Sequence, residues 1–418
     1  MNNTFQKRTA CMSCSQNRVV EFIDLGIQPS GNAFISPNES IEKEPQFPLR
    51  MGVCKNCWQV QLLDHIDKNL LFDDHPYLTG TNQPMVEHFH TLSVKLANDY
   101  SLTRSDLVLD IGCNDGTFLN QFDSQGMSTI GVEPSTRISE MAREQGHVVI
   151  NKFWNSDTAA SFNQLNVKPK LITAMSVFYH VSNLHDFLDG IELVMSSRSV
   201  FVIQAVSLLS LLSKNQFDHF YHEHTCIHSL SSLNNILKKH NLKVIDIEDV
   251  DVHGGSFIAS LALNNSDYEI SEKVTKYAQK ELDEGLKDIG TYMSFGQRAK
   301  DIASHLKQLL IELNAQDEVI FGLGAPLKSS TFLNFADIDS SLIACLTEVN
   351  ELKIGKLSPG KHIPVVDEKA IDKEPDYYVV FAWNYLEYLM MKKKAFLNAG
   401  GKFIVPFPNL RIVSRDDF

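Results

Sequence analysis

Short apolar runs alternate with longer amphipathic segments through the middle of the chain. Leu107–Ile111 is apolar except for Asp110 and is typical of a buried parallel strand. Further apolar runs of strand length lie at residues 129–132, 171–175, 200–205, 244–247 and 256–263. Strands separated by helical segments predict a mainly parallel sheet with helices on both faces.

A second alternating unit begins at Val319, after a charged, helical stretch from Tyr268 to about Leu313. Its predicted strands are residues 319–323, 342–347, 376–383 and 402–406. A chain of 418 residues is expected to form two or three domains. We therefore expect an α/β protein with domains at residues 1–72, 73–265 and 266–418, the middle and last being Rossmann-like.

A glycine-containing loop follows the first central strand. It reads Asp110-x-Gly112-x-x-x-Gly116 and includes Asn114, and the next strand ends in Glu133. Glycines let a ligand approach the backbone, the helix N-terminus offers N–H groups, and an acid at a strand end can accept hydrogen bonds from a ribose. The spacing lacks the middle glycine of a dinucleotide fingerprint. The arrangement resembles the S-adenosylmethionine loop of class I methyltransferases, with dinucleotide binding as the alternative.

Four of the seven cysteines form two C-x-x-C pairs, Cys11/Cys14 and Cys54/Cys57. Two such pairs are typical of a tetrahedral zinc site with four thiolate ligands. Disulfides are the alternative, which a cytoplasmic location would disfavour. We expect one structural zinc that stabilises a small N-terminal domain.

Residues 217–228 combine four histidines, a tyrosine and two acids. A metal site, a solvated loop and a general acid–base centre are all compatible with this composition. If the segment is extended, His222 and His224 share one face, whereas a helical turn brings Tyr221 and His224 together. The sequence leaves both arrangements open.

The overall charge argues against nucleic acid as a partner. The formal net charge is −13, and the basic residues form no stripe. The N-terminus has no apolar signal core, and the longest apolar stretch is too short to span a bilayer. A cytoplasmic protein without nucleic-acid or membrane partners is expected.

Several motifs in order resemble the three-domain sugar C-methyltransferase family. They are the two C-x-x-C pairs, DIGCNDG, YHEH, HGGS, GLGAPLKSSTFLN, SPGKHIP, FAWNY and IVPFP, and they extend over nearly the whole chain. The resemblance implies methylation at position three of a dTDP- or GDP-linked 4-keto-6-deoxy hexose, by a monomer or homodimer. Such sugars occur in antibiotics and in surface polysaccharides such as O-antigens.

The resemblance also implies roles for individual residues. His224, Tyr221 and Glu223 would be catalytic. The methyl donor would be held by Tyr77, Thr81, Asp110, Gly112, Asn114, Gly116 and Glu133. The sugar nucleotide would be bound by His180, Asp218, His222, His253, Lys328 and Asn384. Ile227 and His228 replace the family's usual aromatic pair, which leaves the sugar's identity open.

Two other functions are compatible with parts of the pattern. One is O- or N-methylation of a nucleotide sugar, which needs no ketone. The other is a zinc-ribbon nucleic-acid methyltransferase, which the acidic charge and the C-terminal α/β unit disfavour.

Overall fold

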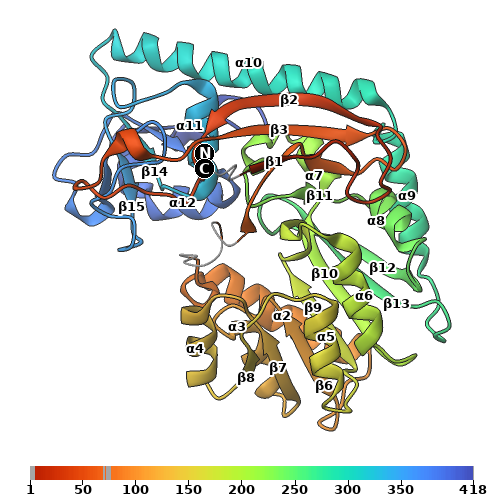
Figure 1. The fold of residues 1–418 in the computed structure, drawn as a ribbon. Coiled ribbons are helices and arrows are strands. Elements are labelled where there is room, and N and C mark those ends of the chain that lie inside the picture. The colour runs from red at the N-terminus through yellow and green to blue at the C-terminus, as the bar shows by residue number, and fades with distance from the viewer. Residues whose placement is uncertain (1–4, 69–70, 72–76, 418) are drawn as a thin grey trace.

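The computed structural model describes residues 5–68, 71 and 77–417 (Figure 1). The domain boundary expected between residues 72 and 73 lies outside the described residues. The N-terminal segment contains β1 (Phe5–Lys7), β2 (Val19–Gln28), the turn η1 (Ile41–Lys43), β3 (Phe47–Cys54), β4 (Val60–Leu62) and β5 (Asp64–Ile66). Strands β2, β3 and β4 form an antiparallel sheet, and β1 pairs with β5.

The middle of the chain forms a seven-stranded sheet of order β12-β13-β10-β9-β6-β7-β8. Its strands are β6 (Leu107–Ile111), β7 (Ser128–Val132), β8 (Val148–Ile150), β9 (Leu171–Met175), β10 (Val200–Val206), β12 (Leu242–Val250) and β13 (Ser256–Leu263). Strand β13 runs antiparallel to both of its neighbours, β10 and β12, and the other neighbouring pairs of this sheet are parallel. Strands β9 and β10 are buried along their whole length, as expected for a sheet covered on both faces.

Helices cover this sheet between its strands. They are α2 (Gln83–Asp99), α3 (Thr117–Asp123), α4 (Thr136–Glu144), α5 (Ser156–Asn163), α6 (Leu184–Val194), α7 (Leu208–Ser213) and α8 (Leu230–Leu237). Short 3-10 turns are η2 (Thr79–Thr81), η3 (Phe178–His180) and η4 (Phe217–His219). Helix α2 begins with Pro84 in its first turn, and the Asn82 side chain accepts a hydrogen bond from the backbone N–H of Met85.

The C-terminal part is a second, six-stranded α/β sheet of order β16-β15-β14-β17-β18-β19. It comprises α9 (Glu272–Asp283), α10 (Ile289–Asn314), β14 (Ile320–Leu323), α11 (Leu327–Ala336), β15 (Leu346–Glu348), β16 (Val365–Asp367), η5 (Glu368–Ala370), β17 (Tyr377–Val380), η6 (Trp383–Tyr385), α12 (Leu386–Lys392), α13 (Lys394–Asn398), β18 (Lys402–Val405), β19 (Arg411–Val413) and η7 (Arg415–Asp417). Two predicted strands are too long. Residues 339–343 form a turn before β15, and β17 ends before the turn that begins at Trp383.

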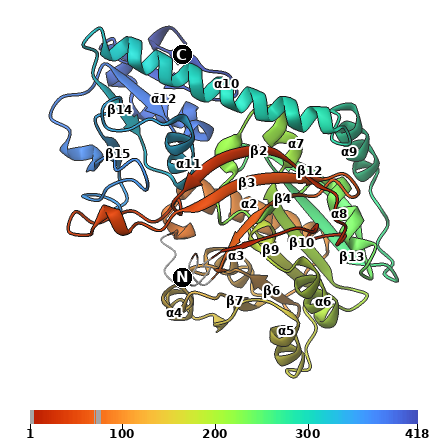
Figure 2. The same ribbon diagram turned by 45° about the horizontal axis from the view of Figure 1, so that its top comes forward.

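Two features join the three parts. The short strand β11 (Cys226–Ile227), which follows the histidine-rich segment, pairs with β4 and completes the N-terminal sheet. Helix α10 lies along β2 on the outside of the molecule (Figures 1 and 2). There Phe22 packs against Tyr292 and Phe295. The N-terminal sheet therefore lies between the central sheet and the long helix.

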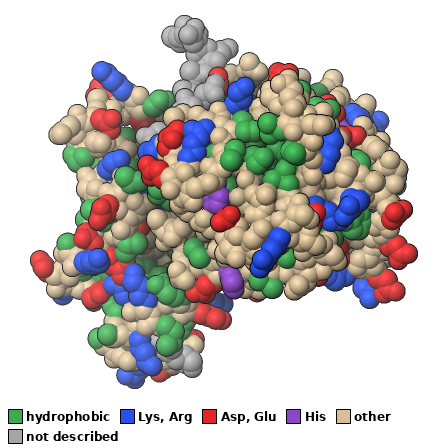
Figure 3. All heavy atoms as spheres, turned by 90° about the horizontal axis from the view of Figure 1, so that it is seen from below, with side chains coloured by type: hydrophobic (Ala, Val, Ile, Leu, Met, Phe, Trp, Pro, Cys, Tyr) green, Lys and Arg blue, Asp and Glu red, His purple; other side chains and the backbone are tan. Residues whose placement is uncertain are grey.

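The outer surface matches the charge pattern of the sequence. On the face shown in Figure 3, Lys and Arg side chains are interspersed with Asp and Glu. Within the described residues, no helix has the length and apolar character needed to cross a bilayer.

Candidate active site

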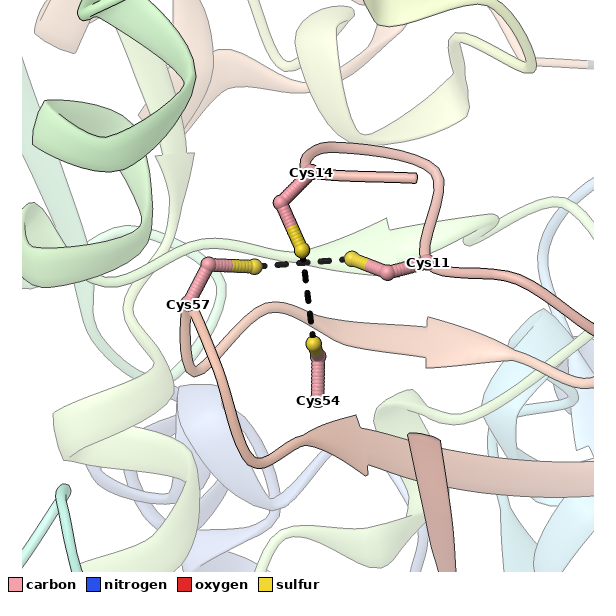
Figure 4. A group of neighbouring side chains, drawn as sticks. All are labelled: Cys11, Cys14, Cys54 and Cys57. Atoms are coloured by element: carbon pink, nitrogen blue, oxygen red, sulfur yellow. Dashed lines mark hydrogen bonds between the residues drawn. The ribbon is translucent and has the colours of Figure 1, made fainter. Parts of the chain in front are cut away.

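The four paired cysteines converge at one end of the N-terminal sheet (Figure 4). The sulfur atoms of Cys11 and Cys57 are 3.4 Å apart, and those of Cys14 and Cys54 are 3.6 Å apart. All four sulfur atoms lie within 4.8 Å of one another. Thiolates about 2.3 Å from a tetrahedral zinc are separated by similar distances. The site therefore fits one zinc with four sulfur ligands and no open position for a substrate.

A cavity opens where the central strands β6, β7 and β9 end. Four residues predicted to bind the donor line it: Tyr77, Gly112, Asn114 and Glu133. The aromatic side chains of Phe153 and Trp154 line another part of the wall. An acid near flat apolar side chains suits the ribose and the base of a nucleoside, so the residues present fit S-adenosylmethionine.

Glu133 ties the glycine loop to the next strand. Its Oε2 accepts a hydrogen bond from the backbone N–H of Asn114 (3.2 Å), and its Oε1 accepts one from the N–H of Ser135 (2.8 Å). Gly112 has φ of +72°, and a Cβ there would lie 2.4 Å from a methyl carbon of Val177. The glycine is therefore required by both conformation and space.

Asp110 lies behind the cavity and is not among the residues that line it. Its Oδ1 accepts a hydrogen bond of 2.6 Å from the hydroxyl of Thr173, on the neighbouring strand β9. Burial raises the pKa of its carboxyl group to about 7. Gly116 and Thr81 do not line the cavity either; the Thr81 hydroxyl donates to the carbonyl of Leu78.

The segment from Tyr77 to Gly80 is clamped onto the glycine loop. The Asn114 side chain accepts from the N–H of Thr79 (2.9 Å) and donates to the carbonyl of Tyr77 (3.1 Å). Asp115 Oδ2 accepts from the N–H of Gly80 (2.8 Å). Sequence reasoning missed Asp115, although an acid beside a glycine at a helix start is a recognisable signal.

The histidine-rich segment forms a turn, which settles the two arrangements left open above. The N–H of His224 donates to the carbonyl of Tyr221, and the two rings lie 3.8 Å apart between centroids. His222 instead packs against Phe47 of the N-terminal sheet. Tyr221 and His224 are brought together, and His222 faces the neighbouring domain.

The buried imidazole of His224 has a defined tautomer. Its Nδ1 lies 2.7 Å from the carbonyl oxygen of His219. A carbonyl can only accept, so Nδ1 carries the proton and Nε2 keeps its lone pair. Burial and the neighbouring histidines hold the pKa of His224 well below its usual range, so the ring is neutral.

His180 connects this turn to the cavity. It lines the cavity, its Nδ1 lies 2.7 Å from the carbonyl oxygen of Glu223, and its ring is 5.1 Å from that of His224. The Glu223 carboxylate accepts a hydrogen bond of 2.9 Å from the side chain of Asn32, in the N-terminal part. The three predicted catalytic residues therefore adjoin both the donor cavity and a second domain.

The C-terminal part contributes a second group of polar residues. Asp218 Oδ2 accepts a hydrogen bond of 2.7 Å from the indole N–H of Trp383. Lys328 Nζ lies 4.4 Å above the Trp383 ring and donates to Asn384 Oδ1 (2.9 Å). His253 lines a second cavity, between α2 and η6. Three predicted substrate residues, Asp218, Lys328 and Asn384, are thus gathered around one tryptophan.

Sequence reasoning missed other residues here. A second glycine-containing loop, residues 322–328, lies at the end of β14. The Nζ of Lys353 donates to the carbonyl of Ala325 in this loop (2.8 Å), and the N–H of Ala325 donates to Glu348 (3.1 Å). The position of Lys353 in the sequence, away from this loop, gave no reason to predict the contact. His88, on α2, is half-buried, and its Nε2 lies 2.6 Å from the side-chain oxygen of Gln204. His219, which lies among other histidines in the sequence, was given no role of its own.

Three sequence families match the chain in succession. Residues 11–72 match a zinc binding domain, residues 87–247 a methyltransferase domain, and residues 251–408 the C-methyltransferase C-terminal domain. The C-methyltransferase NovU of Streptomyces niveus is 29% identical over 407 residues, which are 97% of each chain.

Solved structures of methyltransferases resemble part of the chain. A methyltransferase from Clostridium acetobutylicum, described as S-adenosylmethionine-dependent, is 16% identical with a TM-score of 0.35, over 43% of this chain and 92% of its own. Magnesium protoporphyrin IX methyltransferase from Synechocystis is 13% identical with a TM-score of 0.32, over 47% and 89%.

The order of the three matched families and the full-length relative agree with the two α/β sheets and the four-cysteine site. The chain therefore belongs to the three-domain C-methyltransferase family, with S-adenosyl-L-methionine as its methyl donor and one structural zinc.

Proposed function

We propose that the protein methylates carbon three of a nucleotide-linked 4-keto-6-deoxy hexose through an enolate. A carbon beside a ketone can lose its proton because the electron pair is delocalised onto the oxygen. The observation that carries the proposal is the neutral His224, because the bond from Nδ1 to the carbonyl of His219 leaves Nε2 unprotonated and able to accept a proton. O- or N-methylation needs no such carbon acid, and both the family matched by residues 251–408 and the relative NovU are named for C-methylation.

His224 Nε2 takes the proton from carbon three, and the electron pair of the broken C–H bond becomes the enolate. Tyr221, in ring contact with His224, donates a hydrogen bond to the enolate oxygen. Glu223 and His180 hold the turn at the edge of the donor cavity. S-adenosyl-L-methionine, when bound, supplies an electrophilic methyl group that forms the new C–C bond as its C–S bond breaks.

The donor is held by the cavity at the ends of β6 and β7. Glu133, at the end of β7, accepts hydrogen bonds from the ribose hydroxyls. Gly112 and Asn114 bring the backbone close, and Tyr77 covers the cavity from the clamped segment. Asp110 supports the loop from behind through Thr173.

The nucleotide part of the substrate, dTDP or GDP, is bound toward the C-terminal sheet. Lys328 is a compact positive charge suited to a phosphate, and Asn384 positions it. Asp218 and His253 lie on the central side of the same region and contact the sugar. His222 supports the turn against Phe47.

The test separates proton removal from methyl transfer. Wild-type protein with S-adenosylhomocysteine and a panel of dTDP- and GDP-linked 4-keto-6-deoxy hexoses in D₂O should introduce deuterium at carbon three, measured by mass spectrometry. His224→Ala should not, because the base is missing, whereas His90→Ala, exposed on α2, should exchange normally.

If His224→Ala exchanges at the wild-type rate while Tyr221→Phe does not, the base is elsewhere. If wild-type protein methylates a nucleotide sugar on oxygen or nitrogen, the enolate proposal is wrong.

A further inference from the structure

The imidazole of His219 is buried without a hydrogen-bond partner. The residue is 3% exposed, and among the described residues neither Nδ1 nor Nε2 has a partner at hydrogen-bond geometry, although the backbone of His253 interacts with the ring. Oδ1 of the adjacent Asp218 likewise lacks a described partner at hydrogen-bond geometry, although the backbone N–H groups of Asp218 and His219 interact with this carboxyl group. Buried polar atoms without partners destabilise the folded state and are rare in folded proteins. Their concentration on two consecutive residues indicates that a ligand supplies the partners.

His219 lies between the proposed base and the C-terminal residues. Its ring stacks on that of His224, with 6.1 Å between centroids, and the edge of Trp383 lies 6.4 Å away. It also interacts electrostatically with Lys328 and His253. His224 adjoins His180 of the donor cavity, and His253 lines the second cavity. A sugar presented to His224 would therefore pass beside His219.

The charge state of His219 limits which chemical groups of a ligand can form hydrogen bonds with it. Burial, together with Lys328 and His253, holds its pKa well below the usual range, so the ring is neutral. A neutral imidazole has one donor and one acceptor nitrogen. A phosphate or ketone oxygen can only accept, whereas a hydroxyl can both donate and accept. The pair of unpaired nitrogens therefore matches hydroxyl chemistry best.

We propose that His219 binds a ring hydroxyl of the substrate and determines specificity for that hydroxyl. The inference rests on the proposed function, because it takes a sugar as the substrate. It assigns His219 to binding rather than to proton removal, which remains with His224. The unpaired Oδ1 of Asp218 lies on the adjacent residue and is available to the same sugar.

The experiment combines variants of His219 with substrate analogues. His219→Phe keeps the ring beside His224 and Trp383 but removes both nitrogens, and His219→Gln keeps a donor and an acceptor. The substrates are the nucleotide-linked keto sugar that wild type methylates best and analogues that each lack one ring hydroxyl.

For the full sugar, His219→Phe should raise KM roughly tenfold, as expected for a lost buried hydrogen bond. His219→Gln should restore much of the affinity. Donor affinity and deuterium exchange at saturating sugar should be unchanged. Wild type should bind one analogue more weakly than the full sugar, and His219→Phe should bind that analogue no more weakly than wild type does.

The assignment would be overturned if His219→Phe bound every analogue more weakly than wild type by the same factor, or if its KM for the full sugar were unchanged. If His219→Phe does not fold, His219→Leu replaces it in the same comparison. If wild type methylates none of the sugars, both the proposed function and the proposed role of His219 are wrong. If wild type is active and only the His219 pattern is absent, the proposed function stands.

Discussion

Asp110→Asn should make the protein more stable at alkaline pH, although it alters a residue behind the donor site. The carboxyl group is buried, and its pKa is raised from 3.8 to about 7, chiefly by burial and in part by Glu133. Asparagine can still accept the hydrogen bond from Thr173, because its Oδ1 has the same place and geometry. What the substitution removes is the cost of ionising a carboxyl group away from water.

The sign follows from linkage. Below about pH 4, Asp110 is protonated in both the folded and the unfolded chain, so it contributes no pH dependence. As the pH rises toward 7, the unfolded chain releases this proton and the folded chain retains it, so folding stability falls. One pKa unit corresponds to 1.36 kcal/mol. The full shift therefore corresponds to roughly 4 kcal/mol, and the part between pH 5.5 and 7 to about 2 kcal/mol.

Equilibrium urea unfolding of the donor-free, zinc-loaded protein between pH 5.5 and 8.5 measures this effect. The unfolding free energy of Asp110→Asn minus that of wild type should rise by about 1.4 kcal/mol per pH unit up to pH 7 and then level off. Asp123→Asn, exposed at the end of α3, is the control and should show no such slope. A difference for Asp110→Asn that stays constant over the whole pH range would refute the reasoning.

Metal analysis of wild type should find about one zinc ion per chain, and Cys54→Ala should lower both the zinc content and the soluble yield. Cys345→Ala, which changes a buried cysteine outside the cluster, should keep both. A soluble, metal-free and fully active Cys54→Ala protein would contradict this. Glu133→Ala should weaken donor binding roughly tenfold or more by calorimetry, and Glu348→Ala, the corresponding acid of the second sheet, should not. Lys328→Ala should raise KM for the sugar nucleotide and leave donor affinity unchanged. An unchanged KM would mean that the loop before Lys328 is a structural turn and does not bind the substrate.

Periodicity was sufficient for the architecture. The run at Leu107–Ile111 and the stretch at residues 200–205 are strands because a sheet covered on both faces requires continuous apolar residues. The cysteine spacing was equally informative, since one tetrahedral ion fixes which side chains must meet.

The roles of the two acids could not be read from the sequence. Asp110 and Glu133 both stood out, but Asp110 bonds to Thr173 because β9 is the neighbour of β6 in the sheet order. Glu133, rather than Asp110, accepts the hydrogen bond from a backbone N–H of the glycine loop. Strand order is a long-range property that no local pattern encodes. The turn at Tyr221–His224 likewise depends on packing of β11 against a distant strand.

The pairing of β11 with β4 has a consequence for how the chain folds during synthesis. The N-terminal sheet cannot be completed until Cys226 and Ile227 have left the ribosome. At about 5–20 residues per second, translation from β4 to β11 takes on the order of ten seconds or more. During that interval the edge of β4 is an unpaired template for aggregation. The four cysteines are all made before β4, so zinc can hold the nascent hairpins together while the last strand is awaited.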